Sequence, residues 1–107
     1  MARKKFKTLT EQMYYILLSL TEPCCGIDIM NKVLYLSNQR IKIGPGTLYT
    51  LLGNFQESGF IQEIPALGRK RSYTITDFGK KALKSEYERL LFLVNDGEKY
   101  IEKLWKL

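Results

Sequence analysis

The sequence GPGTLYTLLGNFQESG at residues 44–59 is followed directly by FIQEIPALGRKRSYTI at residues 60–75, and these two runs are the most informative about the fold. Pro45 suits the first turn of a helix, where its missing N–H would have no intrahelical partner in any case. Gly59 suits the position at which a helix ends. Between these two residues, apolar side chains recur at helical spacing along one side, at Leu48, Leu51, Leu52 and Phe55. The first half of the stretch therefore predicts an amphipathic helix.

After this helix, two short β-like runs at 60–64 and 71–75 flank a loop with a basic tip, which predicts a hairpin. Upstream, Thr8 and Glu11 have the capping-box spacing and predict the start of a first helix. Its buried face is expected to comprise Met13, Ile16, Leu17 and Leu20. A second helix is expected over about 26–36, with a core stripe of Ile27, Met30, Val33 and Leu34.

Thr76 and Asp77 are expected to cap a long final helix, so the predicted order is helix, helix, helix, hairpin, helix. This order is typical of a mainly α fold with a small β-hairpin, a winged helix-turn-helix, here with a long C-terminal dimerisation helix added. At 107 residues the chain has the size of one domain. We expect a DNA-binding region over 1–76, with 1–7 as a flexible basic arm, and the dimerisation helix over 77–107 in the same compact unit.

Composition narrows the class of function. Lys and Arg number 17 against 11 acidic residues, and the net charge of +6 predicts attraction to polyanions such as nucleic acid. The chain has no histidine, which removes the commonest general base and metal ligand. We therefore expect a protein that is not an enzyme and that holds no cofactor or metal. No apolar run approaches the ~20 residues of a membrane span, so we expect a cytoplasmic protein without membrane association.

The candidate DNA-binding surface is the side of the helix at 44–59 that lies opposite its apolar side. This side is expected to present Thr47, Tyr49, Thr50 and Asn54. Because this helix contains no Lys or Arg, phosphate contacts are expected from its surroundings, at Lys42, Arg69, Lys70 and Arg71. Two plainer interpretations stay open, because short polar residues near a helix start are often caps and a basic run is often a solvated turn.

Apolar residues of the last helix follow a heptad spacing over three heptads, at Leu83, Tyr87, Leu90, Val94, Gly97, Ile101 and Leu104. This spacing favours a seam between two copies of the chain, completed by Tyr14, Tyr15 and Leu18 of the first helix. A single helix lying on its own core would explain the first half of the pattern. The run Asn95-Asp96-Gly97 could also break the helix, so its continuity stays open.

Several runs match one known family in the same order along the chain, at residues 9–11, 15–20, 44–49, 57–61, 68–73 and 75–79. Together they resemble the PadR family of bacterial transcriptional regulators, in its shorter subgroup with a single C-terminal dimerisation helix. The resemblance implies a homodimeric repressor that binds double-stranded palindromic DNA and is released by a stress signal or by a small-molecule effector held between the subunits. It also implies that Thr47, Tyr49 and Thr50 face DNA and that residues 69–71 belong to the wing.

Two other functions remain as alternatives. Cys24 and Cys25 are adjacent and lie just ahead of a helix start, where the helix dipole favours a thiolate, which suggests a sensor of thiol-reactive compounds or metalloids. The second alternative is an adaptor that uses the same domain for protein contacts only. A basic wing argues against an adaptor, and salt-dependent binding to duplex DNA would distinguish the two.

Overall fold

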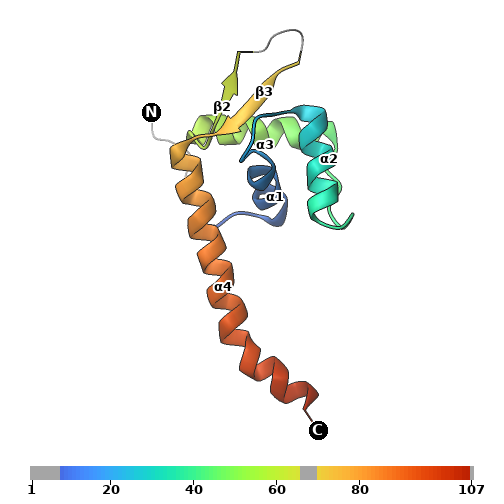
Figure 1. Ribbon diagram of the computed structural model, residues 1–107, viewed down its shortest axis with the longest axis vertical. Helices are drawn as coiled ribbons and strands as arrows, with labels where there is room; N and C mark the ends of the chain where they lie inside the picture. The colour runs from blue at the N-terminus through green and yellow to red at the C-terminus, as the bar shows by residue number, and fades with distance from the viewer. Residues whose placement is uncertain (1–7, 66–69, 107) are drawn as a thin grey trace.

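The computed structural model describes residues 8–65 and 70–106 (Figure 1). Within these residues the elements are α1 (Glu11–Ser19), β1 (Cys24–Cys25), α2 (Gly26–Leu36), α3 (Pro45–Ser58), β2 (Ile61–Ile64), β3 (Ser72–Ile75) and α4 (Asp77–Trp105). The order is the predicted one with β1 added. The mainly helical fold with a small antiparallel sheet confirms the predicted winged helix-turn-helix.

The core lies between α1, α2, α3 and the sheet. The predicted apolar sides of α1 and α3 are confirmed, since the side chains at their centre are fully buried: Ile16, Leu17, Leu20, Leu48, Leu52 and Phe55. Burying an aliphatic or aromatic side chain of this size contributes roughly 1.5–3 kcal/mol each. The packing of these three helices therefore fixes which side of α3 is left for other contacts.

The helix α2 begins where predicted but is rotated relative to the predicted stripe. Ile27 is 59% exposed, whereas Ile29 and Val33 are fully buried, so the prediction that Ile27 belongs to the core is wrong. The strand β1 explains the rotation, because it directly precedes α2 and pairs with β3. Its first residue, Cys24, lies opposite Tyr73, and both are buried. The start of α2 is thereby fixed in orientation by a strand that the sequence did not reveal.

The sheet has the order β1-β3-β2 and is antiparallel throughout. Ile61 lies opposite Ile75 and both are buried, while Gln62 and Glu63 are exposed. The predicted hairpin is confirmed to within a residue at each strand. We call β2, β3 and the residues that join them the wing, of which residues 66–69 lie outside the described part.

A junction of hydrogen bonds joins α3, the wing and α4. The Thr76 hydroxyl donates to the Gly59 carbonyl at 2.6 Å and accepts from the Gly79 N–H at 3.0 Å, so Thr76 is the predicted cap of α4. The Thr76 N–H donates to the Phe60 carbonyl at 2.9 Å. Gly59, which ends α3, has a φ of 81°, a left-handed conformation that favours glycine.

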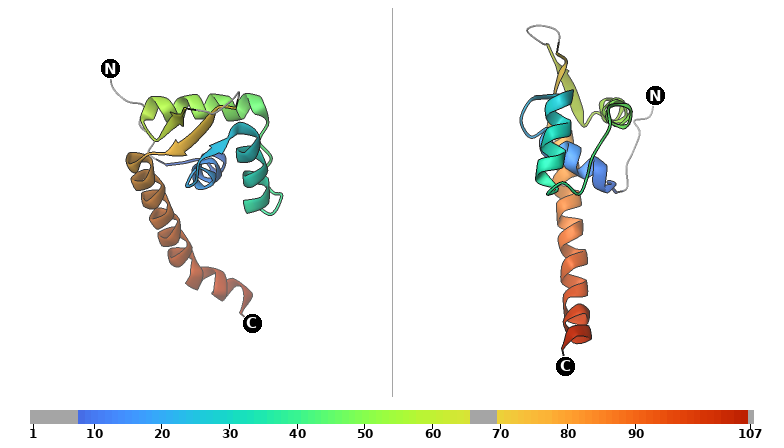
Figure 2. Two further views of the ribbon diagram at one scale, coloured as in Figure 1. Left: turned by 45° about the horizontal axis from the view of Figure 1, so that its top comes forward. Right: turned by 90° about the vertical axis from the view of Figure 1, so that its right-hand side faces the viewer.

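The last helix, α4, is continuous over 29 residues and does not break at Asn95-Asp96-Gly97. Its first half packs beside α1, and its second half runs away from the domain (Figures 1 and 2). The longest dimension of the molecule is consequently 60 Å. None of the described helices is both long and apolar enough to cross a membrane.

The start of α1 differs from the predicted capping box. Thr10, not Thr8, caps the helix, and its hydroxyl accepts from the Met13 N–H at 3.2 Å. The reason lies in a contact far along the chain, because the Leu9 N–H donates to the carboxylate of Glu86 on α4 at 3.1 Å. This bond holds residue 9 in the segment before the helix, and α1 begins two residues later.

Candidate nucleic-acid interface

The outer side of α3 carries the predicted polar residues. Thr47, Tyr49 and Thr50 are exposed, while Asn54 is half-buried. At the helix start, Gly44 is the capping residue and provides no side-chain hydrogen bond to the first N–H groups. These N–H groups and the positive end of the helix dipole suit a phosphate or another anion.

Thr50 is the residue on this side whose chemistry is best defined. Its hydroxyl donates to the carbonyl of Gly46 at 3.0 Å, one turn earlier in α3. The hydroxyl proton is therefore used within the helix, and the methyl group and the oxygen lone pairs remain for a ligand. A methyl group matches the C5-methyl of thymine, and an oxygen acceptor matches the exocyclic amines of adenine and cytosine.

Tyr49 connects α3 to the start of α2 as well as facing outward. A Cβ atom placed on Gly26 would overlap the Tyr49 hydroxyl, so the ring lies directly over the first turn of α2. The ring also lines a cavity of about 180 Å³, together with Cys25, Gly26, Ile27, Lys70 and Arg71. The structure thus brings together one predicted residue of α3 and two predicted residues of the wing.

The wing carries an ion pair that the sequence analysis did not anticipate. Arg71 donates from Nε and Nη2 to the two carboxylate oxygens of Glu63, at 3.1 Å and 2.8 Å. The hydrogen bonds from Arg71 hold the pKa of Glu63 below its ordinary value, with a further contribution from a side-chain hydrogen bond to Gln56. The same hydrogen bonds raise the pKa of Arg71. Both groups are charged at neutral pH, so Arg71 is not an isolated cation.

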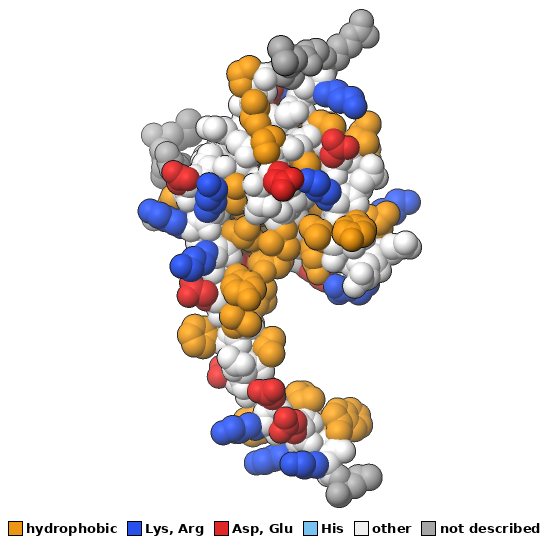
Figure 3. Space-filling model, viewed as in Figure 1, with side chains coloured by type: hydrophobic (Ala, Val, Ile, Leu, Met, Phe, Trp, Pro, Cys, Tyr) orange, Lys and Arg blue, Asp and Glu red, His pale blue; other side chains and the backbone are white. Residues whose placement is uncertain are grey.

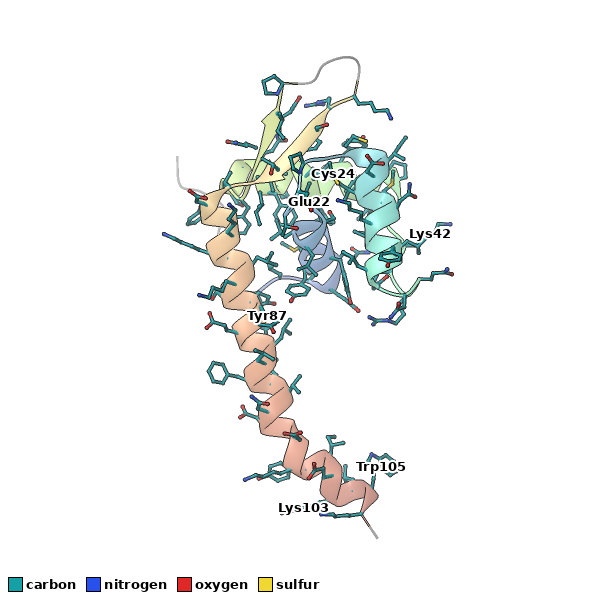
Figure 4. The ribbon with its side chains drawn as sticks, viewed as in Figure 1. Glu22, Cys24, Lys42, Tyr87, Lys103 and Trp105 are labelled. Carbon is teal, nitrogen blue, oxygen red and sulfur yellow. The ribbon has the colours of Figure 1, made fainter. Side chains whose placement is uncertain are left out.

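The other predicted cations are placed differently. Lys70 is exposed beside Arg71, whereas Arg69 lies outside the described residues. Lys42 is exposed in the segment between α2 and α3, beside α2 and away from the wing (Figure 4). Lys42 and the wing therefore offer two separate positive positions (Figure 4).

The predicted dimer surface on α4 is mostly exposed in the single chain. Tyr87, Val94, Ile101 and Leu104 are each more than half exposed, and Leu90 is half-buried. Leu83, by contrast, packs against the chain's own core. Figure 3 shows apolar side chains gathered along α4 and on the neighbouring part of the domain. The first heptad position, Leu83, thus packs against the chain's own core, as the plainer interpretation allowed, whereas most of the later heptad positions are exposed.

Residues of α1 extend this apolar surface. Tyr14 and Leu18 are half-buried, and the pKa of Tyr14 is raised by partial burial and by the nearby Tyr87 of α4. Tyr15 is partly buried against the core, and its hydroxyl accepts a hydrogen bond from Arg40 at 3.0 Å. Tyr14 and Leu18 therefore continue the surface of α4 toward the domain, whereas Tyr15 also has a role within the chain.

Several exposed apolar residues escaped the sequence analysis, namely Leu91, Phe92, Leu93, Tyr100 and Trp105. The run of five apolar residues at 90–94 could have revealed the first three of them, because consecutive residues on a helix point 100° apart and cannot share one narrow stripe. Figure 4 shows Trp105 at the far end of α4. The apolar surface of α4 is therefore wider than a two-stranded seam requires.

The two cysteines are free, buried and directed to different partners. The Cys24 thiol donates to the Ser19 carbonyl at 3.7 Å, and the Cys25 thiol donates to the Asp28 carboxylate at 3.2 Å. Because they are consecutive residues of β1, their side chains point to opposite faces of the sheet. The two thiols therefore do not converge on one metalloid ion. Among the described residues, no three of His, Cys, Asp and Glu are grouped as metal ligands.

A short antiparallel sheet beside α3 and a long final helix with an exposed apolar surface define a winged-helix protein. The family profile described as "Transcriptional regulator PadR-like family" matches residues 16–85, well over half of the chain. The chain belongs to this family, which confirms the resemblance found in the sequence. Members of the family are DNA-binding transcription regulators and not enzymes, so the prediction of a protein without enzyme activity is also confirmed.

Solved structures agree with this fold. The chain is similar to a transcriptional regulator from Clostridium thermocellum, with a TM-score of 0.69 and 21% identity over 90% of this chain and 93% of that one. It is similar to RosR of H. salinarum, with a TM-score of 0.70 and 22% identity over 92% of this chain and 91% of that one. It is also similar to a PadR family transcriptional regulator from Eggerthella lenta, with a TM-score of 0.70 and 24% identity over 84% of this chain and 80% of that one. A comparison with curated proteins found no match.

Proposed function

We propose that this protein is a dimeric repressor that reads a palindromic DNA sequence through α3 and holds the flanking phosphates through the wing. The observation that carries the proposal is the cavity between α3 and the wing, which Tyr49, Lys70 and Arg71 line together. A polar helix side and two cations placed beside it form the combination that a winged helix-turn-helix uses on duplex DNA. The relatives are named as transcriptional regulators, which supports the same function.

In this proposal the outer side of α3 enters the major groove. Thr47 and Thr50 contact base edges, with Asn54 further along the helix. The N–H groups at the helix start and the Tyr49 hydroxyl contact phosphates. Such contacts position the protein on the duplex and do not read its sequence. Arg69, Lys70 and Arg71 of the wing contact phosphates and add affinity, and Lys42 contacts the backbone away from the wing.

Dimerisation is part of the proposed function. The open apolar surface of α4, continued by Tyr14 and Leu18, packs against the same surface of a second copy. A two-fold axis between the copies presents two α3 helices to two half-sites, and this arrangement matches an inverted repeat. A stress signal or a small molecule held between the subunits would release the DNA. The cytoplasm is the expected compartment.

The experiment is selection of bound duplexes from a random pool by the purified protein at near-physiological salt. We expect enrichment of an inverted repeat whose half-sites lie about one helical turn, or a multiple of it, apart. Thr50→Val should change the preferred base at one position in each half-site, because only the hydroxyl is replaced. Thr21→Val is the matched control, since Thr21 is exposed, lies outside α3 and likewise donates to a carbonyl one turn back.

Two outcomes would count against the proposal. If no motif emerges while a known regulator yields one under the same conditions, sequence-specific binding by the free protein is contradicted. If binding to DNA shows no dependence on salt, the electrostatic role of the wing is contradicted, and the adaptor becomes the better hypothesis.

A further inference from the structure

The ion pair between Glu63 and Arg71 is bidentate and lies on the exposed surface of the wing. The guanidinium offers two parallel N–H groups to the two carboxylate oxygens, an arrangement that is more directional than a single contact. The strand register places Glu63 opposite Tyr73 and Ile64 opposite Ser72, so Arg71 reaches back along the hairpin to the carboxylate. The side chains remain open to solvent, with 64% of Arg71 and 36% of Glu63 exposed.

Glu63 also connects the wing to α3. The Gln56 side chain, in the last two turns of α3, interacts with its carboxylate and contributes to the lowering of its pKa. Arg71, which binds this carboxylate, lines the cavity with Tyr49 of α3. One exposed carboxylate therefore lies between the helix that is proposed to read bases and the cation that is proposed to bind phosphate.

The carboxylate changes what Arg71 contributes to DNA binding. A free cation on the wing attracts every phosphate equally and releases a counterion wherever it binds, which strengthens binding to all sequences. A cation already paired with a carboxylate must exchange that partner for a phosphate before it contributes. The exchange is favourable only where other contacts hold the DNA backbone close to the wing, so that a phosphate can replace the Glu63 carboxylate on Arg71.

We propose that Glu63 is a specificity-determining residue, which keeps Arg71 in an intramolecular ion pair on non-cognate DNA and yields it to phosphate only when α3 is docked on its operator. This inference rests on the proposed function, because it requires that α3 and the wing bind the same duplex. Glu63 itself contacts no base in this mechanism. It acts through Arg71 and is therefore a positioning residue.

The test is Glu63→Gln, measured on two 30-base-pair duplexes, one carrying the selected inverted repeat and one of mixed sequence. On the mixed duplex we expect tighter binding and a salt slope that is steeper by about 0.9, the value of one additional phosphate contact. Between 50 and 200 mM salt, such a contact makes the affinity fall roughly three- to fourfold further than in the wild type. On the selected duplex the change should be smaller, so the ratio of the two affinities should decrease.

Two variants make the result specific to Arg71. Glu88→Gln removes the same charge from an exposed position on α4, outside the wing, and should leave the affinity ratio and the salt slope unchanged. In an Arg71→Ala background, Glu63→Gln should lose its effect on the mixed duplex, as expected when two residues act through each other. If the effect persists in full without Arg71, Glu63 acts by direct repulsion of phosphate and the proposal is overturned.

The remaining outcomes also decide the question. An unchanged salt slope, an equal gain on both duplexes, or a loss on both duplexes would each overturn the proposal, the last by making Glu63 a simple support of the wing. Failure of the proposed function looks different, because the wild-type protein would then bind neither duplex with a measurable salt slope. Tight wild-type binding to the selected duplex, with no effect of Glu63→Gln, would reject this inference alone.

Discussion

At the scale of single residues, Gly79 has little freedom to change. It lies in the first turn of α4, and a Cβ atom placed on it would overlap the backbone carbonyl of Phe60 and approach the Ile75 side chain within 2.8 Å. A carbonyl that already accepts the Thr76 N–H cannot move without disturbing the junction of α3, the wing and α4. We expect Gly79→Ala to lower the free energy of unfolding by roughly 1–3 kcal/mol, the usual cost of overpacking.

Chemical denaturation of the purified variant measures this loss, and Gly53→Ala is its control. Gly53 lies within α3, and a Cβ atom there would meet nothing within 4 Å. Removing a glycine from an open helix position should raise the stability by about 0.5–1 kcal/mol. Two glycine-to-alanine changes in helices should thus act in opposite directions. Equal effects of the two variants would show that the contact with Phe60 is not what constrains Gly79.

Also at this scale, the residues that could be predicted were those whose neighbours are close in the sequence. Gly59 and Thr76 were predicted because a helix end imposes its own residue types within a few positions. Ile29 was missed, and Ile27 was placed in the core instead, because helical spacing permits both stripes until β1 fixes the rotation of α2. Glu63 was missed because its partners, Gln56 and Arg71, come from two different elements.

At the scale of elements, a buried carboxylate ties the segment before α1 to α4. Glu86 is only 5% exposed, and it accepts hydrogen bonds from Arg89 at 2.6 Å and 2.7 Å and from the Leu9 N–H. The bonds from Arg89, and further the bond from Leu9, hold the pKa of Glu86 below its ordinary value, against the opposing effect of burial. We expect Glu86→Gln to cost roughly 1–3 kcal/mol of stability at neutral pH, as for other hydrogen bonds to a charged group.

The pKa of Glu86 gives this cost a defined pH dependence. A carboxylate whose pKa is lower in the folded chain than in the unfolded chain stabilises the fold above the unfolded value, near 4.5. That stabilisation is lost as the pH falls through the folded value. Urea unfolding should therefore show a large difference between the wild type and Glu86→Gln at about pH 7 and a smaller one at about pH 3. Glu88→Gln, an exposed neighbour, should show little difference at either pH. A difference for Glu86→Gln that grows toward acid would contradict this account.

The elements themselves were predictable to different degrees for physical reasons. The helices and the hairpin were found because periodicity accumulates over ten or more residues and because caps mark the ends. A two-residue strand such as β1 has no periodicity to detect, and it forms only because β3 offers a free edge. The start of α1 moved from the position that Thr8 predicts to Thr10 because a residue on α4, 77 positions away, binds the Leu9 N–H.

At the scale of the whole molecule, the projecting half of α4 is the feature that a single chain does not explain. Its apolar residues cover far more than the narrow stripe of a two-stranded coiled coil, since Leu93 and Tyr100 lie to one side of the heptad positions and Leu91 to the other. A surface of this width suits contact with more than one element of a partner. In the proposed dimer, α4 would meet both α4 and α1 of the second copy, which accounts for the exposed surface around Tyr14 and Leu18.

The dimer can be tested with two residues of α4 that are equally exposed in the single chain. Val94 is 64% exposed and belongs to the heptad positions, whereas Phe92 is 68% exposed and points about 200° away from Val94 on the helix. We expect Val94→Asp to place two carboxylates in the seam and to weaken dimerisation by roughly 3 kcal/mol or more, about a hundredfold. Phe92→Asp makes the same chemical change on the other side of α4 and should leave the dimer intact. Sedimentation or light scattering over a dilution series measures both.

The same pair of variants links assembly to DNA binding. A monomeric Val94→Asp protein keeps α3 and the wing, so it should still bind a single half-site with its salt dependence unchanged per subunit. It should lose the advantage of the inverted repeat over one half-site, because that advantage comes from joining two binding events in one molecule. If Val94→Asp remains dimeric while Phe92→Asp dissociates, the seam lies on the opposite side of α4. The heptad positions would then account only for the packing of the start of α4 against the core of its own chain.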